Sequence, residues 1–156
     1  MVAETLTGTR AAAKFPVFSP PHGSGVVCAA WGTYSVAANV EDGDIFELCK
    51  LPKCTVIGGA FWATDMDTGT EALDIDIGHA GNATDTADPD AFVNSGVLTG
   101  DAITDLIPAG ANYRPFNMSA GPVTLAAETI VQAEANVAAA TFAAGTIYVV
   151  VHYVVP

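Results

Sequence analysis

Apolar and polar residues alternate most regularly in the segment Leu73-Asp74-Ile75-Asp76-Ile77-Gly78. Successive side chains of a β-strand point to opposite faces, so the leucine and the isoleucines share one face and the aspartates share the other. This pattern predicts a half-buried β-strand and is the clearest strand signal in the chain.

The last apolar segment, Thr146 to Val155, has no polar face. One face would carry Ile147, Val149, Val151, Tyr153 and Val155, and the other would carry Tyr148, Val150, His152 and Val154. In an antiparallel protein, such a strand lies either centrally between layers or in a contact between subunits. The face with Tyr148, Val150, His152 and Val154 is therefore a candidate interface, although the sequence does not say which face is inside.

Several further segments are rich in strand-forming residues and bounded by turn formers. They are Val26–Ala37, Ile45–Leu48, Cys54–Trp62 (whose glycine pair is typical of a bulge) and Tyr113–Met118. Pro115 makes the last of these an edge strand, because proline donates no backbone hydrogen bond. Val123–Ala139 alternates as a strand would but also carries a helical stripe, and its surroundings favour β. About eight strands and no defensible helix predict an all-β, antiparallel jelly roll or β-sandwich over residues 26–156.

Residues 1–25 differ from the rest of the chain and form a separate N-terminal segment. Its three prolines favour an extended path. Its basic and aromatic residues are Arg10, Lys14, Phe15 and Phe18. Two interpretations stay open: a frayed terminus, or an extended arm that uses these four residues to dock on a neighbouring subunit.

The composition narrows the range of partners. The chain has 156 residues, of which 51% are hydrophobic, and a formal net charge of −12. The length fits one domain with a substantial core. An acidic surface repels phosphate backbones and anionic lipids, so neither nucleic acid nor a membrane is an expected partner. The acidity either maintains solubility or attracts a basic protein surface, and the sequence does not separate these.

The N-terminus lacks the apolar core of an export signal, so we expect the protein to be intracellular at synthesis. The longest apolar stretch, Ile147–Val155, is too short to span a membrane as a helix. In this setting Cys28, Cys49 and Cys54 are expected to be buried, reduced thiols.

No residue pattern typical of catalysis or cofactor binding is found in the sequence, so we expect neither an enzyme nor a cofactor. Cys49 and Cys54 form a single pair, whereas a structural zinc site needs four ligands. Asp65-x-Asp67-x-Gly69 resembles a calcium loop slightly, but the same residue types make ordinary turns. The histidines are scattered, without metal-binding spacing: His22, His79 and His152.

Several motifs resemble those of tailed-bacteriophage virion structural proteins. They are Leu51–Ile57, Thr64–Gly69, Leu73–Gly78, and Ala144-Gly145-Thr146-Ile147 leading to Tyr153. The resemblance covers Val26–Ala80 and Val123–Val155 and points to jelly-roll capsid decoration (cement) proteins. It implies a homotrimer on the outer capsid surface of the virion, which binds the major capsid protein and bridges neighbouring capsomers.

A second function class is a carbohydrate- or receptor-binding module of a head fibre or tail. Jelly rolls often carry sugar sites, and three aromatic residues could stack on a sugar ring: Trp31, Tyr34 and Trp62. Because large aromatic side chains dominate core energetics, positions in the core are the favoured interpretation of all three.

Overall fold

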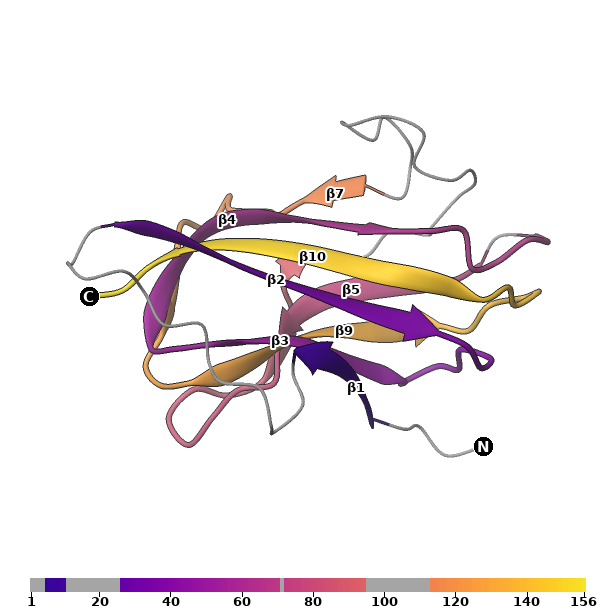
Figure 1. The fold of residues 1–156 in the computed structure, drawn as a ribbon, viewed down its shortest axis with the longest axis horizontal. Helices are drawn as coiled ribbons and strands as arrows, with labels where there is room; N and C mark the ends of the chain where they lie inside the picture. Colours follow the sequence, from indigo (N-terminus) through magenta and orange to yellow (C-terminus); the bar gives the residue numbers. More distant parts are fainter. Residues whose placement is uncertain (1–4, 11–25, 71, 95–112) are drawn as a thin grey trace.

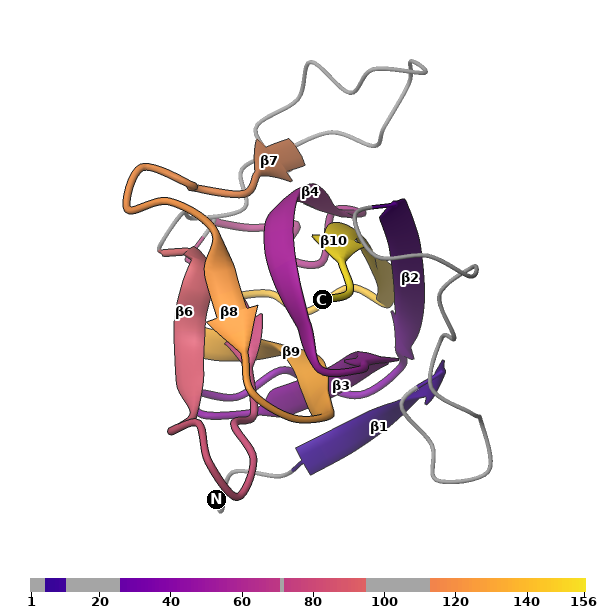
Figure 2. The same cartoon turned by 90° about the vertical axis from the view of Figure 1, so that its left-hand side faces the viewer.

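The computed structural model describes residues 5–10, 26–70, 72–94 and 113–156. Within these ranges the protein consists of ten β-strands and no helix, in agreement with the predicted all-β class. The strands form two sheets, here called sheet A and sheet B, that pack face to face (Figure 1). A view along the strands shows the two sheets enclosing a common interior (Figure 2).

Sheet A has five strands. In spatial order they are β1 (Thr5–Arg10), β3 (Ile45–Leu51), β9 (Thr129–Val137), β5 (Asp74–His79) and β6 (Asp88–Val93). The β1–β3 pair is parallel, and the other pairs in this sheet are antiparallel.

Sheet B is antiparallel throughout. In spatial order its strands are β2 (Val27–Val36), β10 (Gly145–Val154), β4 (Cys54–Ala63) and β7 (Tyr113–Pro115), and β8 (Val123–Leu125) also pairs with β4. The proline-containing β7 is an edge strand, as predicted.

The chain alternates between the sheets. Strands β2 to β5 change sheet at every step, β6 stays beside β5 in sheet A, and β8 to β10 alternate again. The resulting spatial orders, β2-β10-β4-β8 and β3-β9-β5-β6, are those of a jelly roll. The ambiguous segment Val123–Ala139 therefore contains two strands, β8 and β9, and the preference for β is confirmed.

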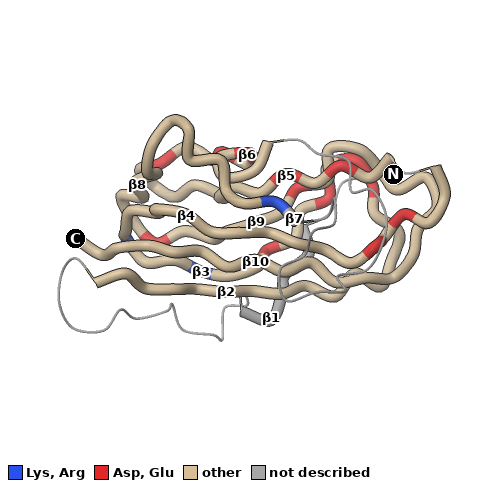
Figure 3. The backbone as a smooth tube through the Cα atoms, turned by 90° about the horizontal axis from the view of Figure 1, so that it is seen from above, with Lys and Arg blue, Asp and Glu red and all other residues tan. Residues whose placement is uncertain are grey.

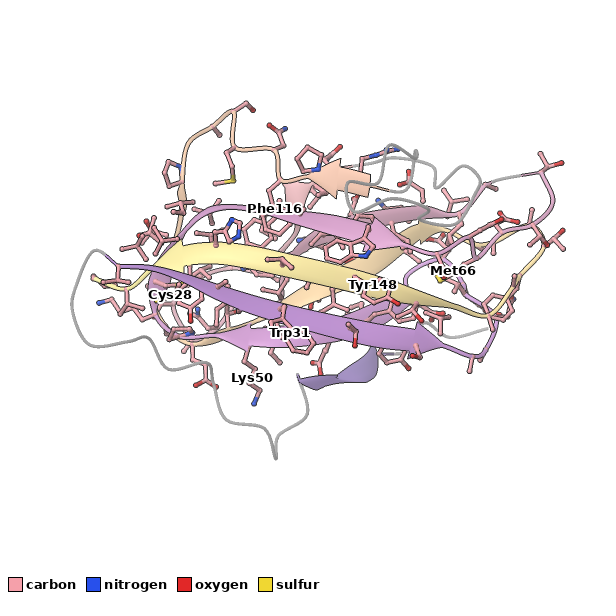
Figure 4. The ribbon with its side chains drawn as sticks, turned by 45° about the horizontal axis from the view of Figure 1, so that its top comes forward. Cys28, Trp31, Lys50, Met66, Phe116 and Tyr148 are labelled. Carbon is pink, nitrogen blue, oxygen red and sulfur yellow. The ribbon has the colours of Figure 1, made fainter. Side chains whose placement is uncertain are left out.

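The core lies between the inner faces of the two sheets. Its fully buried large side chains come from both sheets and from the loops: Phe46, Leu48, Leu51, Phe61, Met66, Leu73, Ile75, Ile77, Phe92, Leu125 and Tyr153. The three cysteines are also buried and are not joined in disulfides, which confirms the expected thiols. Figure 4 shows Cys28 near one end of the sandwich and Met66 near the other.

The β5 strand corrects one prediction. Leu73, Ile75 and Ile77 are in the core as expected, but the strand is not half-buried, because Asp74 and Asp76 are only 8% and 6% exposed. The reason is the position of β5 between β9 and β6, with neighbours on both sides. Asn136 of β9 also covers Asp76 and donates its side-chain amide to that carboxylate.

The glycine pair in β4 marks a bulge, as predicted. His152 lies opposite Gly58 and Tyr153 lies opposite Val56, so Ile57 is the extra residue of β4. Gly59 is closely packed: a Cβ at this position would lie 2.3 Å from the carbonyl oxygen of Val150. Only a residue without a side chain lets the two strands approach this closely at that point.

Thr5–Arg10, which the sequence analysis assigned to the extended N-terminal arm, form β1. This strand pairs in parallel with β3, with Leu6 opposite Phe46 and Arg10 opposite Cys49. This part of the N-terminal segment is therefore one of the two edge strands of sheet A.

Candidate interaction surface

The structure shows which face of β10 is inside. Ile147, Val149, Val151 and Tyr153 are at most 1% exposed and pack in the core. The alternate side chains of Tyr148, Val150, His152 and Val154 point away from the core and are half-buried or exposed. Because β10 is the middle strand between β2 and β4, these four residues form the centre line of the outer face of sheet B.

Apolar and aromatic side chains flank this centre line. Val150 lies opposite Trp31 of β2 on one side and opposite Ala60 of β4 on the other. Tyr148 lies opposite Trp62, and the two rings stack with centroids 5.4 Å apart and an interplanar angle of 6°. Figure 4 shows Trp31 on β2 and Tyr148 on β10, along the same sheet. Cross-strand contacts thus order the face before any partner binds.

We call this surface the outer face of sheet B. It comprises the outward side chains of three adjacent strands, which are mostly apolar or aromatic with hydroxyl residues among them: Val27, Ala29, Trp31, Thr33, Ser35, Thr55, Ile57, Ala60, Trp62, Thr146, Tyr148, Val150, His152 and Val154. Val27, Trp31 and Ile57 are 58%, 47% and 39% exposed, which is unusual for large apolar side chains in one contiguous area. Such exposed apolar patches mark interaction sites in soluble proteins.

The outer face of sheet B lacks formal charge in a strongly acidic protein. None of the outward positions of β2, β10 and β4 is Lys, Arg, Asp or Glu. Among the described residues the acidic side chains lie on the strands of sheet A and in loops at the strand ends, including the β2–β3 and β4–β5 loops (Figure 3). Charged side chains therefore lie away from the outer face of sheet B. The central positions of protein interfaces are depleted of charged residues in the same way.

Two of the three aromatic residues that were predicted to lie in the core do not lie there. Trp31 and Trp62 are not core residues, since both belong to the outer face of sheet B. Tyr34 does point inward, where its ring lies 5.2 Å from that of Phe46. The alternation Val27-Cys28-Ala29-Ala30-Trp31 shows which residues of β2 share a face. Both faces are apolar, however, so nothing in the segment identifies the face that points into the core.

Of the four residues proposed for the arm, the structure describes only the position of Arg10, at the end of β1. Lys14, Phe15 and Phe18 lie outside the described residues. Their role in docking stays a prediction.

The acidic turn before β5 has a structural role. The Asp67 side chain is 1% exposed, and its two carboxylate oxygens accept four backbone N–H groups, from Ala72, Leu73, Ala140 and Thr141. These hydrogen bonds lower the pKa of Asp67 to about 2, against the opposing effect of burial. Because both carboxylate oxygens already accept backbone hydrogen bonds, Asp67 holds the two loops together as a clamp and does not form a calcium loop.

His79 is buried at the end of β5. Its Nδ1 accepts the backbone N–H of Gly81 at 3.3 Å, and its ring lies against Phe92. Burial lowers the pKa of His79, and the carboxylates of Asp88 and Asp85 partly oppose that effect. No group of three or more metal-ligating side chains was found among the described residues, and no helix there could cross a membrane.

Three solved structures contain chains with this fold. A chain of the capsid of Ralstonia phage GP4 has a TM-score of 0.75 and 18% sequence identity, and the match covers 97% of this chain and 98% of that one. A chain of the cyanophage Pam1 capsid asymmetric unit has a TM-score of 0.66 and 23% identity over 95% and 99% of the two chains. A chain of the acidic stable capsid of Helicobacter pylori bacteriophage KHP30 has a TM-score of 0.56 and 15% identity, over 86% and 91%.

No protein-family model matches the sequence, and neither does any curated protein. The similarity is therefore one of fold. The protein shares its architecture, over nearly the whole chain, with chains found in phage capsids.

Proposed function

We propose that the protein is a structural protein of a phage virion, which binds the outside of the capsid and stabilises it by bridging capsid subunits. The observation that carries the proposal is the uncharged apolar outer face of sheet B on a fold shared with phage capsid chains. A protein of this kind acts mechanically, by burying apolar and aromatic surface across a subunit boundary. It needs no catalytic group or cofactor.

The outer face of sheet B serves self-association in this proposal. Three copies form a homotrimer, with Tyr148, Val150, His152 and Val154 of each copy in the wall between subunits. A face without formal charge supports this arrangement, because copies that each carry a net charge of −12 meet there without opposing like charges.

The N-terminal segment makes the contact with the major capsid protein in the same proposal. Arg10 and Lys14 supply positive charge, and Phe15 and Phe18 supply aromatic anchors, which are the residue types enriched at interface centres. Since β1 belongs to sheet A, point substitutions test this contact better than a deletion that removes the strand.

The test uses purified capsids that lack the protein. Wild-type protein should co-sediment with them in a fixed ratio to the capsomers and raise the temperature at which they rupture. Val150→Glu should reduce binding at least tenfold through loss of the assembled form. Phe15→Ser with Phe18→Ser should reduce binding without changing self-association.

Val137→Lys is the control for adding a charge elsewhere: Val137 is 44% exposed and lies on β9 of sheet A, away from the outer face of sheet B, and its register partner is Asp74, so a positive charge there adds no like-charge repulsion. Electron microscopy of the decorated capsids then shows where the protein lies. Failure of the wild-type protein to bind capsids, or its location inside the shell, would refute the proposal.

A carbohydrate- or receptor-binding module is the second candidate. The stacked pair Trp62–Tyr148 and the exposed Trp31 lie on one face, which is an arrangement that could accept a sugar ring. A glycan binder would give a saturable signal on a glycan array, lost in Trp31→Ala, and would leave capsid rupture temperature unchanged.

A further inference from the structure

Two acidic residues lie directly opposite each other on the outer face of sheet A. Asp76 of β5 and Glu134 of β9 are register partners in an antiparallel pair. Asp76 is 6% exposed, and the side-chain amide of Asn136 donates to its carboxylate. Glu134 is half-buried, so neither carboxylate is fully hydrated.

Among the side chains that the structure describes, the other neighbours of this pair are also acidic or uncharged. On β3, Ile45 lies opposite Glu134, and Glu47 lies two residues further along the same face. On β5, Asp74 has the same orientation as Asp76. Asp42 in the β2–β3 loop and Asp90 on β6 act electrostatically on Glu134.

Burial raises the pKa of the Glu134 carboxyl, and the charges of Asp76, Asp42 and Asp90 raise it further, in that order. Like charges directly opposite on adjacent strands destabilise a sheet. Partial burial strengthens the repulsion, because water screens it less. Protonation of the Glu134 carboxyl removes most of this cost.

We propose that Glu134, which lies opposite Asp76 on the neighbouring strand, is an acid-responsive group, which takes up a proton as the pH falls and thereby makes the folded domain more stable. The sign follows from proton linkage. A carboxyl that binds its proton more tightly in the folded state than in the unfolded chain contributes stability at low pH, and this contribution is lost as the pH rises through the folded-state pKa.

A buried histidine on the same strand as Asp76 acts in the opposite direction. The lowered pKa of His79 means that the unfolded chain binds a proton more readily, so His79 reduces stability as the pH falls below about 6.5. The wild-type profile combines both effects. A difference in unfolding stability between variants therefore tests the pair, because the pH dependence of wild-type stability does not separate the two effects.

The experiment compares Glu134→Gln with Glu128→Gln by urea unfolding at pH 7.5 and at pH 5.0. Glu128 is an exposed residue in the β8–β9 turn, so its substitution makes the same change in charge and shape elsewhere. At pH 7.5, Glu134→Gln should lower the unfolding equilibrium constant about 2- to 5-fold relative to Glu128→Gln. At pH 5.0 this advantage should shrink, because the wild-type carboxyl is then partly protonated.

Carboxyl-detected NMR provides a second measurement on the wild-type protein. The Glu134 carboxyl should titrate above the value of an ordinary glutamate. Equal stability of the two variants at both pH values, a less stable Glu134→Gln, or titration of Glu134 at or below the ordinary value would each overturn the proposal.

Discussion

The carboxylate of Asp67 accepts the backbone N–H of Thr141 at 2.8 Å, across 74 positions of sequence. The same side chain accepts the N–H groups of Ala140 and Ala72, each at 2.9 Å, and of Leu73 at 3.2 Å. One buried side chain thus joins the β4–β5 loop to the β9–β10 loop at the end of the sandwich. It supplies the acceptors that these loop N–H groups would otherwise lack.

We expect Asp67→Asn to lower the free energy of unfolding at pH 7 by roughly 2 kcal/mol, because charge-assisted hydrogen bonds to buried N–H groups are replaced by weaker ones. The lowered pKa of Asp67 sets the pH dependence. Its contribution should be complete above about pH 4 and should disappear as the pH falls toward about 2. Urea unfolding of both proteins across this range gives the measurement.

Asp65→Asn is the control for that prediction. Asp65 accepts one hydrogen bond, from the N–H of Asp67, and the asparagine keeps an oxygen at the same position. This variant should therefore stay close to wild type. If it lost as much stability as Asp67→Asn, local turn geometry and not the four-way clamp would explain the effect.

The alternation of β10 predicts opposite outcomes for adjacent valines. Val149 is 1% exposed, so Val149→Glu places a charge in the core and should prevent folding or cost more than about 3 kcal/mol. Val150 points outward, so Val150→Glu should keep the wild-type circular dichroism spectrum and unfold cooperatively. Analytical ultracentrifugation should then show wild-type protein as an assembly and Val150→Glu as a monomer. A monomeric wild-type protein would remove the outer face of sheet B from self-association.

The close approach at Gly59 gives a third prediction. Gly59→Ala should cost about 1–3 kcal/mol, because the added Cβ would lie 2.3 Å from the Val150 carbonyl oxygen and 2.7 Å from the Phe116 ring. The double variant Gly59→Ala, Phe116→Ala, compared with Phe116→Ala alone, separates these contacts in thermal unfolding. The backbone contact should persist, so Gly59→Ala should still lower stability in the Phe116→Ala background. If it cost nothing there, the ring alone would be responsible.

The sequence predicted the strands well because their periodicity is a local property. The final strand, the alternating segment before His79 and the bulge at Gly58 could all be identified from residue type and spacing. Burial on the outer side of a sheet depends instead on neighbours far away in sequence. Asp76 is buried because its strand lies between β9 and β6, and Asn136, 60 positions later, donates to its carboxylate; no local pattern encodes these contacts.

The sequence predicted only part of the candidate surface, for a related reason. The outward set on β10 was identified as one of two alternatives, and the alternation alone could not orient it. Trp31 was assigned to the core because aromatic residues usually lie there, whereas its exposure follows from the register of β2 against β10. Thr5–Arg10 form a strand whose parallel partner lies 40 positions away in register, as for Thr5 and Ile45, and a short edge strand of this kind has little local signal.

The thiols near Tyr153 give a last prediction, about alkaline pH. Burial, and then the charge of Cys28, raise the pKa of Cys54 to about 12, and burial together with the three cysteines raises the pKa of Tyr153 to about 12. Both groups therefore hold their protons more tightly in the folded protein than in the unfolded chain. Their contribution to stability is complete below about pH 8.5 and is lost as the pH rises toward 12.

Wild-type protein should accordingly unfold more easily in urea at pH 10.5 than at pH 8, while Cys54→Ala should show a smaller difference between these two pH values. Cys54→Ala should also be less stable at pH 8, since it leaves a small cavity, so the pH difference and not the absolute stability is the readout. In the folded protein at pH 8, a thiol reagent should label the cysteines at the rate of unfolding, because burial keeps them protonated and covered. Rapid labelling of Cys54 in the native state, or an unchanged pH difference in Cys54→Ala, would contradict this account of the core.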